Sequence, residues 1–125
     1  DHRGAMLRVL GGPGDEGTRL ENRIGEPLAN PYLYIASQVH AGLDGLARRL
    51  AAPPAVVDTY GAAGPALPAT LGEALDALAA SAVLRQGFGA PLMHLFEGVK
   101  RAEIARHVAA ADPAEWERRE YFARY

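Results

Sequence analysis

The chain has 125 residues, 49% of them hydrophobic, with 13 basic and 15 acidic residues and a formal net charge of −2. This size suits one domain or part of one, and the balanced charge argues against a nucleic-acid partner. Without cysteine the sequence excludes disulfides and thiolate metal sites, which suits a cytoplasmic protein, and no apolar run of about 18 residues predicts a membrane span.

The first predicted element is an antiparallel β-hairpin over residues 1–24. Two short runs, 5–10 and 19–24, have the composition of strands, and the glycine-rich segment 11–18 between them predicts a long connecting loop. An isolated two-stranded ribbon is marginal in water and needs more sheet. Because the chain also opens at Asp1 and not at Met, we expect the beginning of the protein to be missing.

A helix is predicted over residues 30–50, because Asn30 can cap its first N–H groups and Pro31 suits the first helical position. Its apolar residues recur at spacings of three and four and predict an internal helix with one buried stripe. The stripe comprises Leu33, Ala36, Val39, Leu43 and Leu46. Gly42 and Gly45 predict the close approach of a neighbouring element.

Residues 51–69 carry four prolines and predict a surface loop at an interface or functional edge, and residues 70–125 predict a helical cap. Within the cap, Thr70 and Glu73 form a capping box before a short helix, Pro91 starts a long helix to about residue 110, and Asp112 begins the last turns. The terminal aromatic residues are expected to bury against this fold or a neighbouring subunit. They are Trp116, Tyr121, Phe122 and Tyr125. The predicted class is α+β, a hairpin followed by several helices.

Several chemical signals in the sequence have simpler interpretations. The segment 12–18 has the glycine spacing of a phosphate-binding loop, but it lacks the lysine and leads into a strand, so we interpret it as a hairpin connection. Two pairs, His40 with Asp44 and Glu103 with His107, lie one helical turn apart without a metalloprotease motif, and solvated helix faces commonly carry such pairs.

The arginines of the hairpin form the most informative pattern. Arg19, Glu21 and Arg23 occupy alternate positions, so in a strand they share one face. Such a ladder can be a solvated strand edge. However, Arg3 and Arg8 add two more guanidinium groups before the first lysine, Lys100, and arginine is preferred where carboxylate or phosphate is held in a fixed geometry. The pattern therefore indicates anion binding.

Three segments together resemble the C-terminal part of the catalytic domain of glutamine synthetase. They are RGAMLRV, TRLENR and ANPYLYIASQVHAGLDG, and the terminal WERREYF is similar to the end of that family. The resemblance covers nearly the whole chain. It implies ATP-dependent amide formation from glutamate and ammonia through γ-glutamyl phosphate, with Mg²⁺ or Mn²⁺ as the metal cofactor and stacked rings of identical subunits as the assembly.

The resemblance also implies roles for individual residues. Glu21 resembles a carboxylate that binds a metal, and Arg3, Arg8 and Arg23 resemble arginines that hold the transferring phosphate or the substrate carboxylate, with Arg8 and Arg23 as the catalytic pair. Arg19 resembles an arginine that binds the nucleotide phosphates. The family's other metal ligands and its nucleotide and ammonia pockets precede the matching region, so these 125 residues alone are expected to be inactive.

Two alternatives remain open. The segment ENRIGEPLANPY departs from the commonest glutamine synthetase form, which leaves room for a ligase that joins glutamate to a polyamine or another amine. The second is a noncatalytic remnant that binds subunits of a related ligase through the terminal aromatics. Tyr60 lies where some bacterial members carry a regulatory tyrosine, but its surroundings match poorly, and we expect no regulation there.

Overall fold

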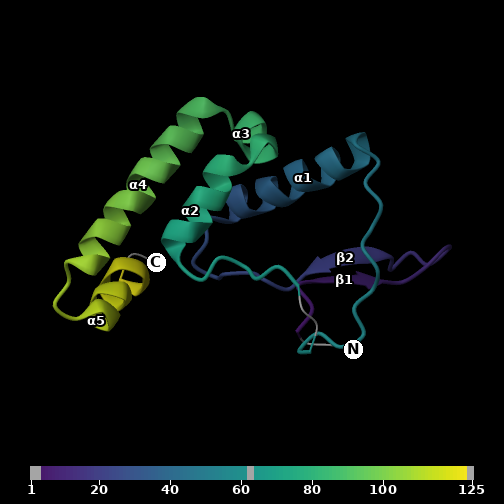
Figure 1. Cartoon of the computed structure of the whole chain (residues 1–125), viewed down its shortest axis with the longest axis horizontal. Helices are drawn as coiled ribbons and strands as arrows, with labels where there is room; N and C mark the ends of the chain where they lie inside the picture. The colour runs from purple at the N-terminus through teal and green to yellow at the C-terminus, as the bar shows by residue number, and fades with distance from the viewer. Residues whose placement is uncertain (1–3, 62–63, 124–125) are drawn as a thin grey trace. The chain divides into compact units, whose positions relative to one another are not determined.

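A computed structural model describes residues 4–61 and 64–123 of the chain (Figure 1). The strands are β1 (Leu7–Leu10) and β2 (Arg19–Asn22). The helices are α1 (Pro31–Ala47), α2 (Leu71–Ala80), α3 (Ala82–Phe88), α4 (Ala90–Val108) and α5 (Pro113–Glu117), which continues as a π-helical turn over Arg118–Phe122. A hairpin followed by helices confirms the predicted α+β class.

The chain forms two compact units. The hairpin unit comprises Asp1–Asn30 and Leu50–Pro65, and the helical unit comprises Pro31–Arg49 and Ala66–Tyr125. The proline-rich segment is therefore divided between the units, its first part belonging with the hairpin. Within the described residues, no helix has the length and apolar character needed to cross a bilayer.

The hairpin is antiparallel, with Arg8 directly opposite Glu21 and Val9 opposite Leu20. The pairing extends past the strand ends, because the Arg23 N–H donates to the Met6 carbonyl at 2.9 Å. The loop that joins the strands is closed at its base by Thr18, whose hydroxyl accepts from the Gly12 N–H at 3.0 Å and donates to the Gly12 carbonyl at 2.8 Å. The segment 12–18 is therefore a hairpin connection, as we interpreted it.

The two faces of the ribbon differ in an unexpected way. The face that carries the charged pair Arg8 and Glu21 is half-buried. The opposite face is apolar and exposed, with Leu7, Val9 and Leu20 each more than half accessible within the described chain. Apolar residues gathered on one side of a ribbon are typical of a sheet that packs on a core.

The segment after α1 contains no helix or strand among its described residues, as predicted. The carboxylate of Asp58 accepts from the backbone N–H groups of Gly61 and Tyr60, each at 3.0 Å, and these two bonds lower the pKa of Asp58. Thr59 lies against Gly4, where an added Cβ would meet the threonine hydroxyl at 2.8 Å. This part of the loop therefore packs on the start of the hairpin unit.

Helix α1 begins at Pro31, as predicted, but the prediction of a buried stripe is wrong for the described chain. None of its residues is buried, and Val39, Leu43 and Leu46 are all more than half exposed. The predicted close approach at Gly42 and Gly45 is also missing, since no described atom lies within 4 Å of a Cβ built at either. The helix makes its close contact elsewhere, through His40.

His40 of α1 packs on α3. Its ring meets Phe88 edge to face with the centroids 5.4 Å apart, and a Cβ added at Gly87 would come within 2.5 Å of it. Gly87 is thus the point at which two helices meet, since only a residue without a side chain leaves room for the His40 ring.

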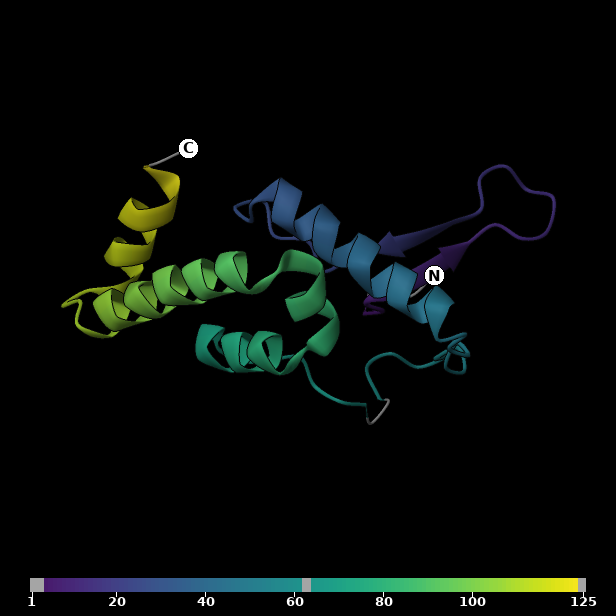
Figure 2. The same cartoon turned by 90° about the horizontal axis from the view of Figure 1, so that it is seen from above.

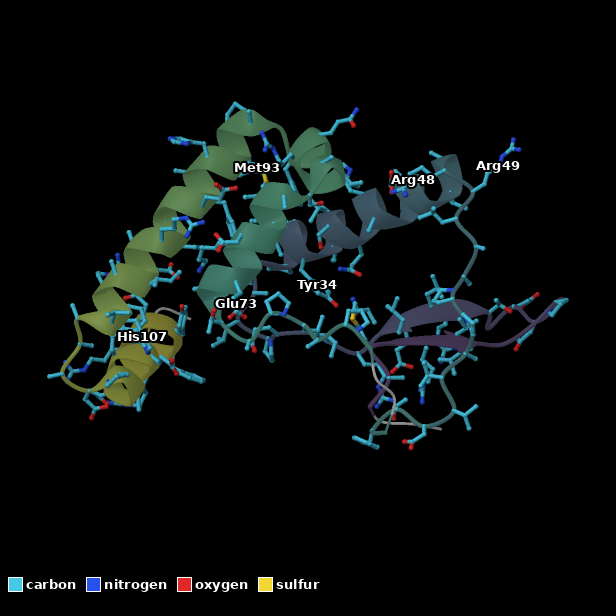
Figure 3. All side chains as sticks on the ribbon, in the orientation of Figure 1. Tyr34, Arg48, Arg49, Glu73, Met93 and His107 are labelled. Carbon is cyan, nitrogen blue, oxygen red and sulfur yellow. The ribbon has the colours of Figure 1, made fainter. Side chains whose placement is uncertain are left out.

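The short helix expected after Thr70 is α2, and a second helix that was not predicted, α3, follows it after Ser81. Thr70 caps α2 as predicted, accepting from the Glu73 N–H at 3.1 Å. Ser81 then adopts an extended backbone (ψ 105°) and its hydroxyl accepts from the Leu84 N–H, which starts α3. The side chains Leu75 of α2 and Met93 of α4 are the buried apolar residues of the described chain. Figures 2 and 3 show α2 running beside α4 with Met93 on the α2 side.

The end of the chain folds back on α4, as expected for its aromatic residues. Trp116 meets the ring of His107 edge to face at 5.4 Å between centroids, and Tyr121 donates from its hydroxyl to Glu103 at 3.2 Å. Phe122 is instead two-thirds exposed (67%), and Tyr125 lies outside the described residues.

Candidate functional site

Glu21 of β2 lies between two guanidinium groups. Arg8 of β1 donates to Glu21 Oε2 from Nε at 2.9 Å and from Nη2 at 2.7 Å, so its fork grips one carboxylate oxygen. Arg23, two residues along the chain from Glu21, approaches the other oxygen, Oε1, at 3.6 Å from Nε. The arginine–glutamate–arginine cluster (Arg8, Glu21 and Arg23) is therefore a connected set on one face of the hairpin.

The local fold explains why these three residues meet. Arg8 and Glu21 are cross-strand partners, and directly opposite side chains of an antiparallel pair lie close together on one face. Positions two apart on a strand share a face, which brings Arg23 to the same side as Glu21. The hydrogen bond from the Arg23 N–H to the Met6 carbonyl continues the strand pairing one residue beyond the end of β2, so Arg23 stays on the face of Glu21.

The cluster is partly open to solvent. The side chains of Arg8, Glu21 and Arg23 retain 27%, 34% and 26% of their exposure. Such a half-exposed ion pair contributes on the order of 1 kcal/mol or less to stability. Two guanidinium groups and one carboxylate leave the cluster with one excess positive charge. The cluster is thus better suited to attracting an anion than to stabilising the fold.

Arg23 has the most donor capacity left for a ligand. Its guanidinium makes no polar contact other than the 3.6 Å approach to Glu21 within residues 4–61 and 64–123. A guanidinium has five N–H donors in a rigid planar fork that matches the oxygens of carboxylate and phosphate. Arg23 can therefore bind an anion without giving up a short bond.

The other two predicted arginines are not in the cluster. Arg19 shares the strand face but is exposed, and its Nη1 donates to the Gly17 carbonyl at 2.9 Å, so its guanidinium is directed into the hairpin loop. Arg3 lies outside the described residues.

The described residues do not form a divalent metal site on their own. They contain no group of three His, Asp or Glu side chains that could surround an ion. Glu21 fits as one ligand of a larger set: Arg8 occupies Oε2, while Oε1 has only the longer contact to Arg23. Because Mg²⁺ is held by carboxylates together with waters and substrate phosphates, one carboxylate oxygen is a meaningful but incomplete contribution.

The helical pairs considered in the sequence have structural partners. Asp44 accepts from Arg48 Nη1 at 3.0 Å, and the buried Glu103 accepts from Lys100 Nζ at 2.7 Å. His107 lies 3.3 Å from Glu117. Neither the pair of His40 and Asp44 nor that of Glu103 and His107 is joined, as expected for structural residues.

Residues 1–121 match the family model described as glutamine synthetase, catalytic domain. The chain is 42% identical to the γ-glutamylanilide synthase of Acinetobacter sp., over 98% of this chain and 26% of that protein. It is 39% identical to human lengsin, over 79% of this chain and 20% of that protein. It is 34% identical to the glutamine synthetase of Methanococcus maripaludis, over 96% of this chain and 28% of that protein.

The chain thus spans about a quarter of the length of the relatives it matches. The resemblance noted in the sequence and the match to the catalytic domain agree over almost every residue. The chain belongs to the glutamine synthetase family.

Proposed function

We propose that the whole protein carrying this chain is an ATP-dependent ligase that joins ammonia to the side-chain carboxylate of glutamate. The observation that carries the proposal is the arginine–glutamate–arginine cluster, in a chain that belongs to the glutamine synthetase family. In this reaction the γ-carboxylate of glutamate attacks the γ-phosphorus of ATP and ADP leaves. Ammonia then attacks the acyl carbon of γ-glutamyl phosphate, phosphate leaves, and the extra proton passes to solvent.

The cluster suits the charge that moves in these steps. In phosphoryl transfer, catalysis comes chiefly from positioning and from neutralising charge on the transferring oxygens. Arg23, with its unused donors, would hold the transferring phosphoryl group or the substrate carboxylate. Arg8 would do so more weakly, since its fork already grips Glu21 and therefore serves first to fix the carboxylate.

The remaining predicted roles belong to the same proposal. Glu21 would supply one oxygen to Mg²⁺ or Mn²⁺, which in such reactions neutralises phosphate charge, with the other ligands coming from outside this chain. Arg19 would bind the nucleotide phosphates after releasing Gly17, and Arg3 would join the substrate-binding arginines. We expect the whole protein to act in the cytoplasm, where ATP is available, as a ring-forming homo-oligomer.

A purified whole protein tests the proposal directly. With ATP, glutamate and Mg²⁺, we expect ADP release that depends on ammonia, together with one glutamine formed per ADP. A γ-glutamyl hydroxamate formed when hydroxylamine replaces ammonia would report the acyl phosphate. If ADP release required no amine, or if no amine supported it, the ligase assignment would be wrong.

A related amine ligase is the second candidate. The specific observation in its favour is the 42% identity to a protein named γ-glutamylanilide synthase, against 34% to a named glutamine synthetase. Comparing kcat/KM for ammonia, aniline and putrescine separates the two. A preference for ammonia supports glutamine synthesis, and a preference for either larger amine supports the alternative.

The third candidate, a noncatalytic remnant, differs from both ligases in that it would bind a related ligase but have no activity of its own. It should associate with a related ligase in size-exclusion chromatography through the C-terminal aromatic residues without adding activity. Ammonia-dependent ADP release by the purified whole protein would exclude it.

A further inference from the structure

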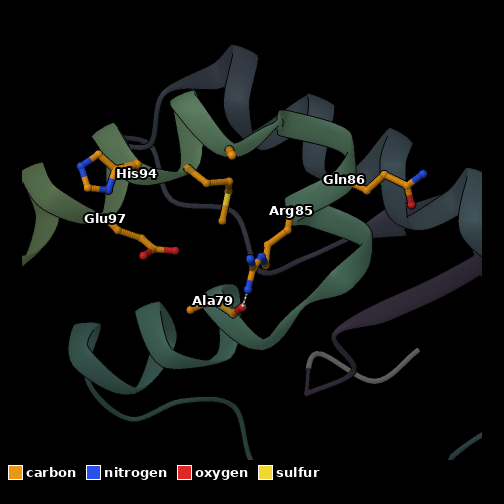
Figure 4. Close-up of a pocket in the computed structure, with 7 residues that line it drawn as sticks. Ala79, Arg85, Gln86, His94 and Glu97 are labelled. Atoms are coloured by element: carbon orange, nitrogen blue, oxygen red, sulfur yellow. Dashed lines mark hydrogen bonds between the residues drawn. The ribbon is translucent and has the colours of Figure 1, made fainter.

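A pocket of about 470 Å³ lies in the helical unit, whereas the described residues assigned to catalysis belong to the hairpin unit. It is formed by the end of α2, by α3 and by the first half of α4 (Figure 4). The lining residues are Ala79, Arg85, Gln86, Ala90, Met93, His94 and Glu97. Its volume falls in the range of about 300–1,000 Å³ that is usual for small-molecule sites.

The pocket carries opposite charges on different helices. Arg85 comes from α3 and Glu97 from α4, and Figure 4 shows both side chains extending into the space beside Ala79. The Arg85 side chain makes one hydrogen bond within the described residues, a 3.3 Å contact from Nη1 to the Ala79 carbonyl. Glu97 has no hydrogen bond or ion pair with any residue in the described ranges. The two charges line one pocket without neutralising each other.

Besides the two charged residues, the lining has an apolar part, formed by Ala79, Ala90 and Met93, and the polar side chains of Gln86 and His94. Met93 is buried, with 6% of its surface accessible, and Ala79 and Ala90 line the same pocket. Methionine adapts its shape to apolar ligands because its side chain is unbranched and polarisable. A ligand that matches this lining has one anionic group, one cationic group and an apolar part.

We propose that this pocket binds a free α-amino acid with an apolar side chain. The α-carboxylate would accept from the fork of Arg85, the α-ammonium would donate to Glu97, and the side chain would lie on Met93. A simple anion would meet Glu97 and a simple cation would meet Arg85, so each would gain one favourable contact and one repulsion. A zwitterion satisfies both.

The test is calorimetric titration of the whole protein with L-leucine, which is not a substrate of the proposed ligase reaction. We expect a dissociation constant in the millimolar range or tighter. The unmodified protein is also titrated with 3-methylbutylamine, which lacks the carboxylate, and with 4-methylpentanoate, which lacks the amine. Each should bind at least about tenfold more weakly, because it leaves one charged group in the pocket unpaired.

Two variants assign the binding to this pocket. Arg85→Gln and Glu97→Gln should each weaken leucine binding by about 10- to 100-fold, since each removes a charge-assisted hydrogen bond. Arg48→Gln, which removes an exposed arginine just after the end of α1, should leave it unchanged.

Three results would overturn the proposal. The first is no leucine binding at concentrations up to about 20 mM, which would reveal a dissociation constant of about 1 mM. The second is equal binding of leucine and either analogue. The third is leucine binding that neither pocket variant weakens. The analogue titrations need no variant, so the proposal stays testable if a variant fails to fold. Ligase activity plays no part in these measurements, and their failure would not bear on the proposed function.

Discussion

The two oxygens of Glu21 have different surroundings. Oε2 receives two short bonds from Arg8, while Oε1 faces Arg23 across 3.6 Å. The first contact orients the carboxylate, and the second leaves both Oε1 and the Arg23 donors accessible to a ligand. This asymmetry separates a positioning role for Arg8 from a binding role for Arg23.

Replacing Arg23 with lysine tests the binding role. In the whole enzyme, Arg23→Lys should lower kcat by about 100-fold, the usual cost of losing a donor that stabilises charge in the transition state. Lysine keeps the charge but cannot reproduce the planar fork. Steady-state ADP release measures the effect, with Arg48→Lys, at an exposed position just after α1, as the control. Equal kinetics for the two variants would remove Arg23 from the proposed mechanism.

Glu115 carries a pH-dependent contribution to the C-terminal turn. Hydrogen bonds from Arg118 and then Arg119 lower its pKa to about 2. A carboxyl group whose pKa is lower in the folded than in the unfolded state stabilises the fold at pH values above its unfolded pKa. For Glu115 this stabilisation is lost as the pH falls from about 4.5 to about 2.

The variant Glu115→Gln measures this contribution. Trp116 is the single tryptophan of the chain, so its fluorescence in a urea titration reports on this segment. Near neutral pH the variant should unfold at a lower urea concentration than the unmodified protein. The difference should shrink below about pH 4.5 and vanish near pH 2. A difference that stays constant with pH would show that the ion pairs of Glu115 do not stabilise the segment.

At the residue level the sequence predicted the strand face but not the contacts of each arginine. Alternation places Arg19, Glu21 and Arg23 on one side of a strand. That Arg8 stands opposite Glu21 depends on the register, which the loop fixes, and that Arg19 turns to Gly17 depends on the loop's conformation. Neither can be obtained from residue spacing alone. Arg85 and Glu97 were missed as a pair because the fold, and not their spacing, brings α3 and α4 together.

Among the elements, α1 and α3 meet through a glycine. Gly87→Ala should destabilise the helical unit by roughly 1–3 kcal/mol, because the new methyl would overlap the His40 ring, which is itself packed on Phe88. Thermal or urea unfolding of the 125-residue chain measures the change.

Gly42→Ala is the matched control. No described atom lies within 4 Å of its added methyl, so the substitution should stabilise α1 by roughly 0.5–1 kcal/mol through higher helix propensity. Similar changes for the two variants would contradict the observed contact between α1 and α3.

The buried carboxylate of Glu103 joins α4 to the end of the chain. It accepts from Lys100 and from the Tyr121 hydroxyl, and Lys100 also lies over the Tyr121 ring, 5.7 Å from its centroid. Burial is the main cause that raises the pKa of Tyr121, and the negative charge of the nearby Glu103 raises it further. The phenol therefore remains a donor at neutral pH. The lysine is thus the cation that compensates a buried negative charge.

Lys100→Met should therefore destabilise the protein by about 1–3 kcal/mol in urea unfolding, since it leaves a buried acceptor short of a partner. The control is Arg101→Met, one residue along α4, whose ion pair with Asp76 is exposed and should contribute less than about 1 kcal/mol. Equal losses for the two variants would contradict a special role for Lys100.

Element boundaries were predictable where local chemistry dictates them. Helix α1 begins at Pro31, and Thr70 and Asp112 cap the starts of α2 and α5. These signals depend only on neighbouring residues. The division at Ser81 was missed, since a serine between alanines can continue a helix or cap a new one, and packing decides which. The burial of α1 was mispredicted for a different reason: periodicity indicates which side is apolar, not whether anything in the chain covers it.

At the scale of the whole molecule, most large apolar side chains are on the surface. Leu75 and Met93 are the buried hydrophobic residues of the described chain, while the apolar sides of the hairpin and of α1 are open. Large exposed apolar areas on a soluble protein commonly mark interaction surfaces. Exposed apolar surfaces such as the stripe on α1 and the hairpin face are expected for a chain that spans about a quarter of the length of its relatives.

We predict that the 125-residue chain alone has no ligase activity, because one carboxylate oxygen cannot by itself hold a catalytic divalent ion against water. The measurement is glutamine formation by the purified chain with ATP, glutamate, ammonia and Mg²⁺, set against a reaction without protein. Formation above that background, with no partner added, would refute the prediction and would require the metal and nucleotide sites to lie within these residues.

The way in which Thr18 closes the hairpin loop has a practical consequence. Its hydroxyl ties both backbone groups of Gly12 across the base of the loop, so residues 13–16 lie beyond this closure and Arg8 and Glu21 lie before it. Labelling the tip, for instance at exposed Glu16, should leave the strand register intact. A fluorophore attached there would sit a few residues from the proposed catalytic groups and could signal their occupancy without touching them.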